Sequence, residues 1–505
     1  MSDYKNIIIN IMFPLLSGTA VSFSYYSDKS AFLIFFALSP YIYSIIYKFN
    51  IYKIFIYSFS LYFFSLIWLS NVVSRATDNF VLRLLLSIFL VSAISLILSV
   101  QLNIPLLIFR FISLSPIKTA LIFPFLYILG EWLQGVFSPI EFPWIRLGNI
   151  VSPFIAFIQS ASVFGTLFIS MLILFINVFI ALFFYYIKSV KKYIFAFSAL
   201  FIISANMIFG YVSLNRTKEN NGKESSAVIV QGNFPKETKF TSEPEEILDK
   251  YIDLLYSAES KKADLILFPE TSMHSDVYTI DKLKNRLNNV CCDYSALLLF
   301  GSQYNSDEKY YNACMALFPD NRIEAVYLKR QLVPFGEYNP FKSDSFRFTA
   351  TDFSAGEECS LIKSDKGMIG CAICFESVFP GSVSECVKEG AEAVIILTND
   401  SWLGKIIPLY QHYSHSVMRA VENNRYVLTS TNTGISSVIN NKGEVIVQSE
   451  LNTESVIESS FYMNNDISFY TKYGDVVIFP SCMIIIFVCL KFVFGQIYGL
   501  IFKKT

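Results

Sequence analysis

The chain has 505 residues, a formal net charge of −1 and a mean hydropathy of +0.46, and only 16% of its residues are charged. A single water-soluble domain of this length is rarely so apolar, and a near-neutral charge gives no basis for nucleic acid as a partner. The charges are unevenly spread, with 17 in residues 1–215, 61 in residues 216–475 and 3 in residues 476–505. This distribution predicts an N-terminal membrane domain over 1–215, a soluble domain over 216–475 and a C-terminal membrane helix over 476–505.

Eight apolar runs approach or exceed the roughly 20 residues that a membrane-spanning helix needs. Seven precede the soluble domain and one follows it: Ile7–Tyr26, Ala31–Tyr47, Ile51–Val73, Leu84–Ile108, Ala120–Phe137, Phe154–Ile187, Tyr193–Val212 and Val476–Phe502. We therefore expect a polytopic α-helical membrane domain with eight spans. The first run is too long for a signal peptide, and another run follows it at once. Glu131 lies in the fifth run, where an acidic residue favours a functional role over a position near the interface.

The basic residues between the runs predict the orientation, because Lys and Arg favour cytoplasmic loops. Ten of them occupy the loops on one side of the predicted spans, and four occupy the other side, Lys29, Arg75, Arg83 and Arg146. Both termini are therefore expected in the cytoplasm. Residues 213–475 are expected on the opposite side, which is the periplasm or the cell exterior in a bacterium and a lumen in a eukaryote.

Residues 226–470 alternate short apolar runs, typical of strands, with amphipathic stretches, typical of helices. The expected strands are Ser226–Val230, Ala263–Phe268, Ala296–Phe300, Ala325–Leu328, Met368–Ile373, Ala393–Leu397, Tyr426–Thr431 and Ser436–Asn440. The expected helices are Pro244–Lys262, Ile280–Tyr294, Ser382–Glu389 and Gln411–Asn423. Asn440–Gly443 is typical of a hairpin turn. This order predicts a layered α/β domain with a mixed sheet.

The cysteines do not indicate a disulfide framework, because their number is odd and their spacing irregular. There are nine: Cys291, Cys292, Cys314, Cys359, Cys371, Cys374, Cys386, Cys482 and Cys489. Cys371 and Cys374 form a CxxC pair on an expected strand, where such residues point to opposite faces and lie roughly 10 Å apart. A disulfide needs Cα atoms within about 7 Å, so a redox pair is disfavoured.

A zinc site is also disfavoured. The chain has three histidines, His274, His412 and His415. The spacing of the last two differs from the His-x-x-x-His spacing of metalloproteases. We interpret His412 and His415 as polar packing groups or as groups that support an active site.

The remaining interpretation is a single nucleophile, Cys374, at the end of a strand. Two other apolar runs also end in ionisable residues, Glu270 after one and Lys329, then Glu337, after another. Ionisable residues at several strand ends are typical of α/β active sites. Each of them alone is more often a surface charge or a packed polar group. Together they suit acyl transfer, with Glu270 taking the thiol proton, Cys374 attacking a carbonyl and Lys329 stabilising the oxyanion.

These residues and their surroundings resemble a known family. Pro269-Glu270, Lys329 with "LVPFGE" (332–337) and Cys374-Phe375-Glu376 resemble the Glu-Lys-Cys triad of the nitrilase superfamily. Further segments resemble the apolipoprotein N-acyltransferase family, which completes the maturation of bacterial lipoproteins in the inner membrane: "GEWLQGVFSPIEFPW" (130–144), "VQGNFP" (230–235), "TNDSWLG" (398–404), "QHYSHSVMRAVENNRYVLTSTNTGISS" (411–437) and "FYTKYGD" (469–475). Gln134, Thr429 and Phe375 depart from residues frequent in that family.

The resemblance implies a nitrilase-like αββα sandwich for the soluble domain. It also implies that Cys374 accepts the sn-1 acyl chain of a phospholipid, such as phosphatidylethanolamine, as a thioester. The α-amine of a diacylglyceryl-modified N-terminal cysteine of an apolipoprotein would then take the chain. In this reaction Glu270 is the proton acceptor and Lys329 the oxyanion stabiliser.

The same resemblance assigns supporting roles. Glu337 and Glu376 correspond to supporting carboxylates, and the expected substrate-binding residues are Gln231, Asn312, Phe375 and Trp402. Trp402 would lie in a mobile loop over the site. Neither a metal nor a cofactor is implied.

Two other functions remain open at this point. A membrane-tethered amidase of the nitrilase type would use the same triad and give the acyl group to water. A transporter or sensor would carry paired broken helices or inverted repeats in its spans, and the sequence shows neither. The aromatic segments 346–353 and 401–413 are equally compatible with lids at the membrane surface and with packing on the domain.

Overall fold

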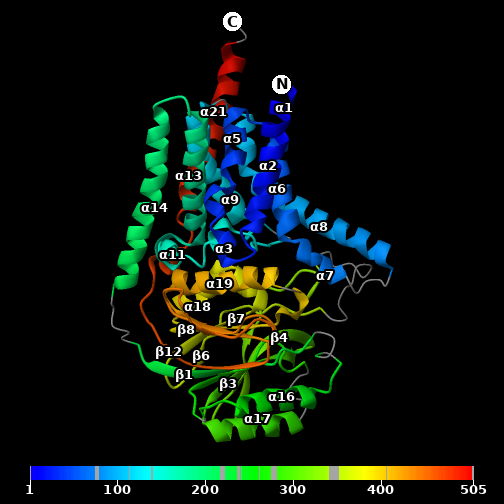
Figure 1. Ribbon diagram of the computed structural model, residues 1–505. Helices are drawn as coiled ribbons and strands as arrows, with labels where there is room; N and C mark the ends of the chain where they lie inside the picture. The colour runs from blue at the N-terminus through cyan, green and yellow to red at the C-terminus, as the bar shows by residue number, and fades with distance from the viewer. Residues whose placement is uncertain are drawn as a thin grey trace. The chain divides into compact units, whose positions relative to one another are not determined.

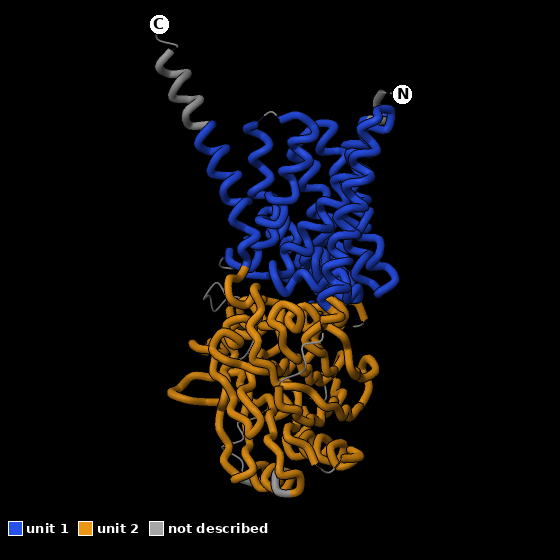
Figure 2. The backbone as a smooth tube through the Cα atoms, turned by 90° about the vertical axis from the view of Figure 1, so that its left-hand side faces the viewer, with its two compact units in different colours: residues 1–213, 475–505 blue, residues 214–474 orange. Residues whose placement is uncertain are grey.

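The computed structural model forms two compact units, one from residues 1–213 and 475–505 and the other from residues 214–474 (Figure 2). The structure describes residues 2–73, 79–112, 114–137, 140–216, 222–235, 239, 241–260, 262–274, 281–339, 352–404 and 406–502. Of the aromatic segment 346–353, the part before residue 352 lies outside the described residues.

The first unit is helical (Figure 1). Its elements are α1 (Ser2–Ile7), η1 (Ile8–Met12), α2 (Phe13–Phe23), α3 (Asp28–Ala31), α4 (Ile34–Ala37), α5 (Ser39–Tyr47), α6 (Ile51–Ser65), η2 (Ile67–Leu69), α7 (Ser70–Val73), α8 (Phe80–Asn103), η3 (Pro105–Arg110), α9 (Pro116–Leu133), α10 (Leu147–Ile150), α11 (Ile155–Ile158), α12 (Ala161–Phe164), α13 (Thr166–Tyr185), α14 (Lys191–Asn215) and α21 (Ile478–Phe502).

Several of these helices are long and apolar enough to cross a membrane. Within the described residues there are five, namely Asp28–Tyr47, α8, α9, α13 and α14, or six if α6 and the following Ile67–Val73, bent by 51°, form one span. The first and last predicted spans fall on the shorter apolar helices Ile8–Phe23 and Ile478–Lys491. Several apolar helices are therefore confirmed, whereas the number eight stays a prediction.

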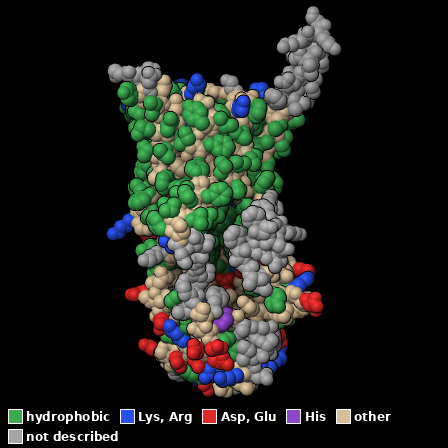
Figure 3. All heavy atoms as spheres, turned by 90° about the vertical axis from the view of Figure 1, so that its right-hand side faces the viewer, with side chains coloured by type: hydrophobic (Ala, Val, Ile, Leu, Met, Phe, Trp, Pro, Cys, Tyr) green, Lys and Arg blue, Asp and Glu red, His purple; other side chains and the backbone are tan. Residues whose placement is uncertain are grey.

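Hydrophobic side chains cover most of the helical unit on the face that Figure 3 shows. Large hydrophobic side chains such as Phe89, Phe197 and Phe201 are 72%, 68% and 60% exposed. Water-soluble monomers rarely expose so many large hydrophobic side chains, and such a surface is typical of contact with lipid.

Glu131, flagged in the sequence, is buried inside the helical unit rather than exposed at its surface. Its Oε1 accepts a hydrogen bond from the backbone N–H of Leu147 at 2.9 Å. One turn further, Gln134 Nε2 donates to the Tyr62 hydroxyl at 2.6 Å. Glu131 and Gln134 thus each have one hydrogen-bond partner within the unit, although Glu131 Oε2 and Gln134 Oε1 are buried without one among the described residues.

The second unit contains twelve described strands and the helices that cover them. The strands are β1 (Glu224–Gln231), β2 (Leu265–Leu267), β3 (Leu297–Ser306), β4 (Lys309–Leu317), β5 (Ile323–Leu328), β6 (Ile362–Lys363), β7 (Met368–Ile373), β8 (Ala393–Thr398), β9 (Tyr426–Thr431), β10 (Ser437–Ile439), β11 (Val445–Gln448) and β12 (Ser455–Tyr462). The helices are α16 (Pro244–Tyr256), α17 (Asp281–Tyr294), η6 (Cys374–Val378), α18 (Pro380–Lys388), η7 (Asp400–Trp402), α19 (Ile407–Asn423) and α20 (Phe469–Tyr473).

These strands form two mixed six-stranded sheets, with the orders β12-β1-β2-β3-β4-β5 and β11-β10-β9-β8-β7-β6. The centre of each sheet is parallel, β1-β2-β3 in one and β7-β8-β9 in the other, and the flanking strands are antiparallel. Figure 1 shows α16 and α17 outside the first sheet and α18 and α19 outside the second. This is the four-layer order that the resemblance implied.

Alternation along the buried strands explains the layers, because neighbouring residues of a strand point to opposite faces. On β2, Leu265 and Leu267 belong to the core between the sheets, whereas Ile266 belongs to the core under α16 and α17. On β3, Leu298 and Leu299 divide in the same way. A strand buried on both faces has an unbroken apolar sequence, as the sequence of these strands predicted.

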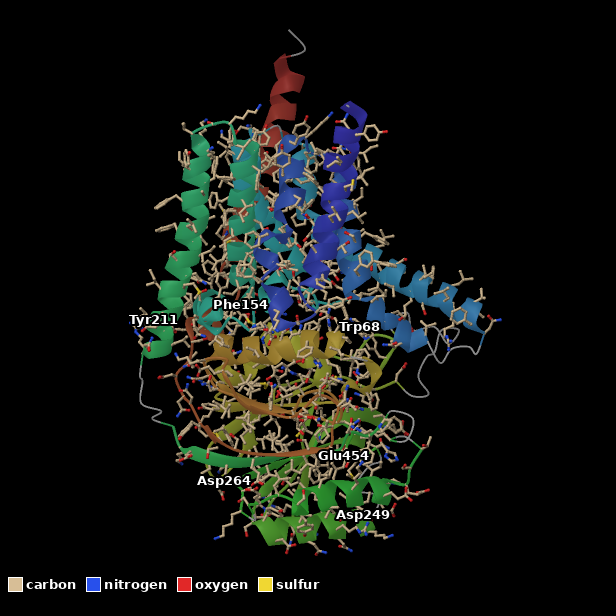
Figure 4. All side chains as sticks on the ribbon, in the orientation of Figure 1. Trp68, Phe154, Tyr211, Asp249, Asp264 and Glu454 are labelled. Atoms are coloured by element: carbon tan, nitrogen blue, oxygen red, sulfur yellow. A yellow bond between two sulfur atoms is a disulfide. The ribbon has the colours of Figure 1, made fainter. Side chains whose placement is uncertain are left out.

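Charged residues hold the outer elements of this unit in place. Asp249 on α16, labelled in Figure 4, pairs with Arg286 on α17. Asp264, also labelled, accepts a hydrogen bond from the Ser226 backbone N–H at 2.8 Å and so joins the start of β2 to β1. The Asp264 contact adds to the parallel pairing of β1 with β2.

Candidate active site

Glu270 lies three residues beyond the end of β2, where the chain passes close to β3. A Cβ atom at Gly301 would lie 2.5 Å from the Glu270 Cα, so only glycine allows this approach. The loop is held by a hydrogen bond from the Gly301 N–H to the Pro269 carbonyl at 3.1 Å. The Glu270 side chain is thereby directed into the domain, where it is only 6% exposed.

Lys329 follows β5 and joins Glu270 to Glu337. Its Nζ lies 3.1 Å from Glu270 Oε1 and 2.9 Å from Glu337 Oε1. Asn312 on β4 donates from Nδ2 to the same two oxygens, at 2.8 Å and 2.9 Å. Four side chains from three chain segments thus form one buried network of one cation, two carboxylates and one amide.

The charge of Lys329 is stabilised by this network. Burial by itself lowers the pKa of the ammonium, but the Glu270 and Glu337 carboxylates outweigh burial and hold the pKa well above its usual value. Lys329 therefore stays protonated throughout the physiological pH range. A permanently charged donor beside a nucleophile can stabilise an oxyanion.

Cys374 begins η6 directly after β7 and is buried. Its φ of +52° lies in the left-handed region, which residues with a Cβ seldom adopt and which is often retained at functional sites. Burial raises the pKa of the thiol, and Glu270 and Asp400 raise it further, while Lys329 and Thr398 act in the opposite direction. The thiol is protonated at neutral pH, and its attack on a carbonyl requires a base.

Glu376 joins the turn that carries Cys374 to the turn that carries Lys329. It is fully buried. Its two carboxylate oxygens accept hydrogen bonds from four donors: the Tyr327 hydroxyl at 2.9 Å and the backbone N–H groups of Ile373 at 2.7 Å, Arg330 at 2.7 Å and Gln331 at 3.1 Å. Removal of this carboxylate would leave four buried donors without an acceptor.

Asp400 and His412 also lie beside Cys374, and we had not predicted a role for Asp400. One nitrogen of His412, one oxygen of Asp400 and the Cys374 sulfur lie within 4.8 Å of one another, which makes them the one group in the described part of the chain that could hold a metal ion. His412 Nδ1 lies 2.8 Å from Asp400 Oδ1, however, and a hydrogen bond accounts for that contact. Asp400 follows a strand end, so the signal that singled out Glu270 was present for it too.

A second buried lysine, Lys239, lies near Glu270, and the sequence did not indicate it. It is fully buried, and its Nζ donates to the backbone carbonyl of Glu270 at 3.0 Å. Burial lowers the pKa of this amine to about 7, although Glu270 acts to raise it. No pattern around residue 239 distinguishes it from a surface lysine, because its burial depends on the tertiary structure.

The four expected substrate-binding residues lie in different surroundings. Asn312 belongs to the Lys329 network, and Phe375 is buried against Phe379 with ring centroids 5.1 Å apart. Trp402 is partly exposed in the loop after β8. Gln231 has both ends of its amide engaged by the protein, with Oε1 accepting from the Ser436 hydroxyl at 2.6 Å and Nε2 donating to a backbone carbonyl at 2.8 Å.

The structure contains one disulfide among the described cysteines, between Cys359 and Cys386, with Cα atoms 5.6 Å apart. The number and spacing of the cysteines had given no sign of this pair. Cys371 and Cys374 are both free. The CxxC pair is thus not bridged, in agreement with its position on a strand and the following turn.

Comparison with known proteins gives two matches to family models in chain order. Residues 17–179 match the apolipoprotein N-acyltransferase N-terminal domain, and residues 227–463 match the carbon–nitrogen hydrolase family. The apolipoprotein N-acyltransferase of Geobacter metallireducens is 28% identical over 70% of this chain and 70% of its own, and that of Aquifex aeolicus is 29% identical over 67% and 75%. Apolipoprotein N-acyltransferase 2 of Treponema denticola is 32% identical over 46% and 48%.

Proposed function

This chain belongs to the apolipoprotein N-acyltransferase family of the nitrilase superfamily, and on that premise we propose that Cys374 carries an acyl group from a phospholipid to the N-terminal amine of a lipoprotein. The observation that supports this proposal most strongly is the buried ammonium of Lys329 between Glu270 and Glu337. Its charge acts electrostatically on the Cys374 thiol, as does that of Glu270.

The first half-reaction forms a thioester. Glu270 takes the proton from Cys374 Sγ, and the thiolate attacks the sn-1 ester carbonyl of the phospholipid. Lys329 stabilises the negative charge that develops on the carbonyl oxygen. When the tetrahedral intermediate collapses, the ester C–O bond breaks, Glu270 returns its proton to the departing alkoxide, and a lysophospholipid leaves.

The second half-reaction transfers the acyl chain to an amine. The α-amine of the diacylglyceryl-cysteine attacks the thioester carbonyl and gives a proton to Glu270. Collapse of the intermediate breaks the C–S bond, and the Cys374 thiolate recovers the proton from Glu270. The product is an amide, and the enzyme returns to its starting state, as a ping-pong mechanism requires.

Two independent features support a periplasmic location for residues 214–474. The bias of ten basic residues against four favours a periplasmic position for this unit. The Cys359–Cys386 disulfide supports the same side, because disulfides persist in oxidising compartments and are rare in the cytosol. Protease added to spheroplasts should therefore cleave this unit while leaving a cytoplasmic marker protein intact, and protection from cleavage would contradict the proposed topology.

The acyl-transfer reaction is tested with the full chain in vesicles that contain phosphatidylethanolamine labelled in its sn-1 palmitoyl chain. Mass spectrometry should find a palmitoyl thioester on Cys374, and addition of a diacylglyceryl peptide should move the label to the peptide. Glu270→Gln should prevent both steps. Label on Cys371 would overturn the choice of nucleophile. Release of free palmitate without peptide acylation would favour a hydrolase that uses water.

A further inference from the structure

His412 on α19 lies between Asp400 and the backbone of Cys374. The side chain is buried, only 4% exposed. Nδ1 lies 2.8 Å from Asp400 Oδ1, and Nε2 lies 3.1 Å from the Cys374 carbonyl oxygen and 3.0 Å from Ser377 Oγ. The triad does not use His412, and the sequence suggested only a packing or supporting role for it.

The protons of His412 can be assigned from these neighbours. The Cys374 carbonyl can only accept, and the Ser377 hydroxyl already donates its proton to that carbonyl at 2.8 Å. Ser377 therefore offers a lone pair to Nε2. On the other side, Asp400 Oδ1 also accepts from the Thr398 hydroxyl at 3.2 Å. Acceptors thus face both ring nitrogens, an arrangement that favours a proton on each of them and the imidazolium form of His412.

The hydrogen bond from His412 Nε2 is to the carbonyl of Cys374, whose backbone conformation is unusual. Cys374 has a φ of +52°, a conformation that a residue with a Cβ keeps only when its surroundings hold it. A hydrogen bond from a charged donor to its carbonyl is stronger than one from a neutral donor. The direction of the Cα–Cβ bond, and with it the position of the sulfur, depends on this backbone conformation.

We propose that protonated His412, paired with Asp400, is a positioning residue for the acyl-transfer reaction, which holds the backbone of Cys374 so that its sulfur faces Glu270 and Lys329. The inference rests on the proposed function and deepens it. Asp400 lies in η7 together with Trp402, so the pair also ties the nucleophile to the loop that was expected to cover the site.

The charged and titratable groups around His412 determine how the pair responds to pH. Asp400 faces it from η7, Glu270 from the loop after β2 and Cys374 from η6, while Arg419 of the same helix donates to the Ser377 carbonyl at 3.3 Å. Burial alone lowers the pKa of His412, but Asp400, the Cys374 carbonyl and Glu270 raise it above its usual value. The charged ring is therefore favoured, and it loses its proton at a higher pH than a free histidine side chain does.

Nuclear magnetic resonance on the full chain labelled with 15N-histidine tests the protonation state directly. The chain has three histidines, so the His412 signals can be assigned by elimination with His274→Gln and His415→Gln. At pH 7 both ring nitrogens of His412 should carry protons, and in Asp400→Asn the ring should become neutral. A single-proton ring in the wild type at pH 7 would overturn the proposal.

The pH dependence of thioester formation tests the positioning role. In the wild type the rate should fall at alkaline pH as His412 loses its proton. His412→Gln retains one donor for the Cys374 carbonyl but does not titrate, so the rate should be lowered about 10- to 100-fold at pH 7 and its alkaline fall should disappear. His415→Gln, a change at another buried histidine of the same helix, should keep the wild-type profile.

The outcomes separate this proposal from the proposed function. If the rate of thioester formation in His412→Gln fell at alkaline pH as it does in the wild type, the role of His412 would be refuted while the thioester chemistry would stand. Absence of any thioester in the wild type would refute the acyl-transfer function, whereas the protonation of His412 would still be measured by magnetic resonance.

Discussion

Lys329→Met is the most informative single change, because it removes one charge from a buried network and keeps a side chain of similar length. The ammonium lies 3.1 Å from Glu270 and 2.9 Å from Glu337. At an effective dielectric constant of about 20, each contact amounts to about 5 kcal/mol of attraction before the cost of burial is subtracted. Removal of one partner from a buried pair costs about 3–5 kcal/mol, so the free energy of unfolding should fall by about that amount.

A matched control is available in the same unit. Lys250 pairs with Glu454, labelled in Figure 4, at 2.5 Å, but the two side chains are 34% and 50% exposed. Lys250→Met should therefore cost only about 0–1 kcal/mol. Unfolding of both variants in denaturant can be followed by the reaction of the buried free cysteines, such as Cys371, with a thiol-reactive dye.

The catalytic effect is measured separately, as the rate at which labelled phospholipid forms a thioester. Loss of a single oxyanion donor lowers rates by about 10²–10³-fold, and we expect at least that for Lys329→Met. In Lys329→Met with Glu337→Gln, one of the two facing carboxylates is gone. This double variant should therefore be more stable than the single one but no more active.

Two results would refute this reasoning. If Lys329→Met unfolded within about 1 kcal/mol of Lys250→Met, the network would not be a desolvated ion pair. If it formed the thioester at the wild-type rate, Lys329 would have no part in the chemistry.

Three other changes should give distinct results. Cys374→Ala should form no thioester, whereas Cys371→Ala should still carry the label on residue 374, as peptide mass spectrometry can show. Cys386→Ser breaks the bridge that spans 27 residues and should lower the free energy of unfolding by about 3.5 kcal/mol, as measured by denaturant titration. Adding reductant to the wild type should lower its free energy of unfolding by the same amount. Lys239 has a pKa of about 7 in the folded chain, below its usual value of about 10.5, so the unfolded chain binds more protons between these values. Wild-type stability should therefore rise from pH 7 to pH 9.5 relative to Lys239→Met, and parallel curves would contradict the burial of this amine.

The sequence determined those elements whose signal, an apolar run, lies within their own residues. Met368–Ile373 and Tyr426–Thr431 were predicted as strands with the bounds that β7 and β9 have in the structure. Both are fully or almost fully buried in the centre of a parallel sheet, so both are continuous apolar runs. The same runs located Glu270, Lys329 and Cys374 at strand ends, because an apolar run that stops at an ionisable residue can be recognised without the fold.

Several antiparallel strands that flank the parallel centres of the sheets were missed. β12 (Ser455–Tyr462) contains Glu and several Ser residues, and it is a strand because its backbone pairs with β1 along its whole length. β4 was missed although Asn312, which it carries, had been selected through the resemblance. The hydrogen bonds of β12 come from a partner distant in the chain, and its composition alone gives no signal.

Hydropathy likewise counts apolar residues but does not detect where a helix breaks. The run Phe154–Ile187 is divided in the structure into α11, α12 and α13, with Gly165 at a φ of +76° before the last of them. The run Ile51–Val73 bends by 51° after α6. The sequence thus determined that the first unit is apolar and helical, and the arrangement of its helices depends on packing.

Only the tertiary structure decided which polar groups meet. Lys329 and Glu270 are 59 residues apart in the chain, and His412 lies 38 residues beyond Cys374, whose carbonyl oxygen is 3.1 Å from its Nε2. Cys359 and Cys386, too, are joined across 27 residues with no signal in their spacing. Distances of a few ångströms between such residues depend on the register of two sheets and the path of their loops, and these are properties of the whole packed domain rather than of any segment.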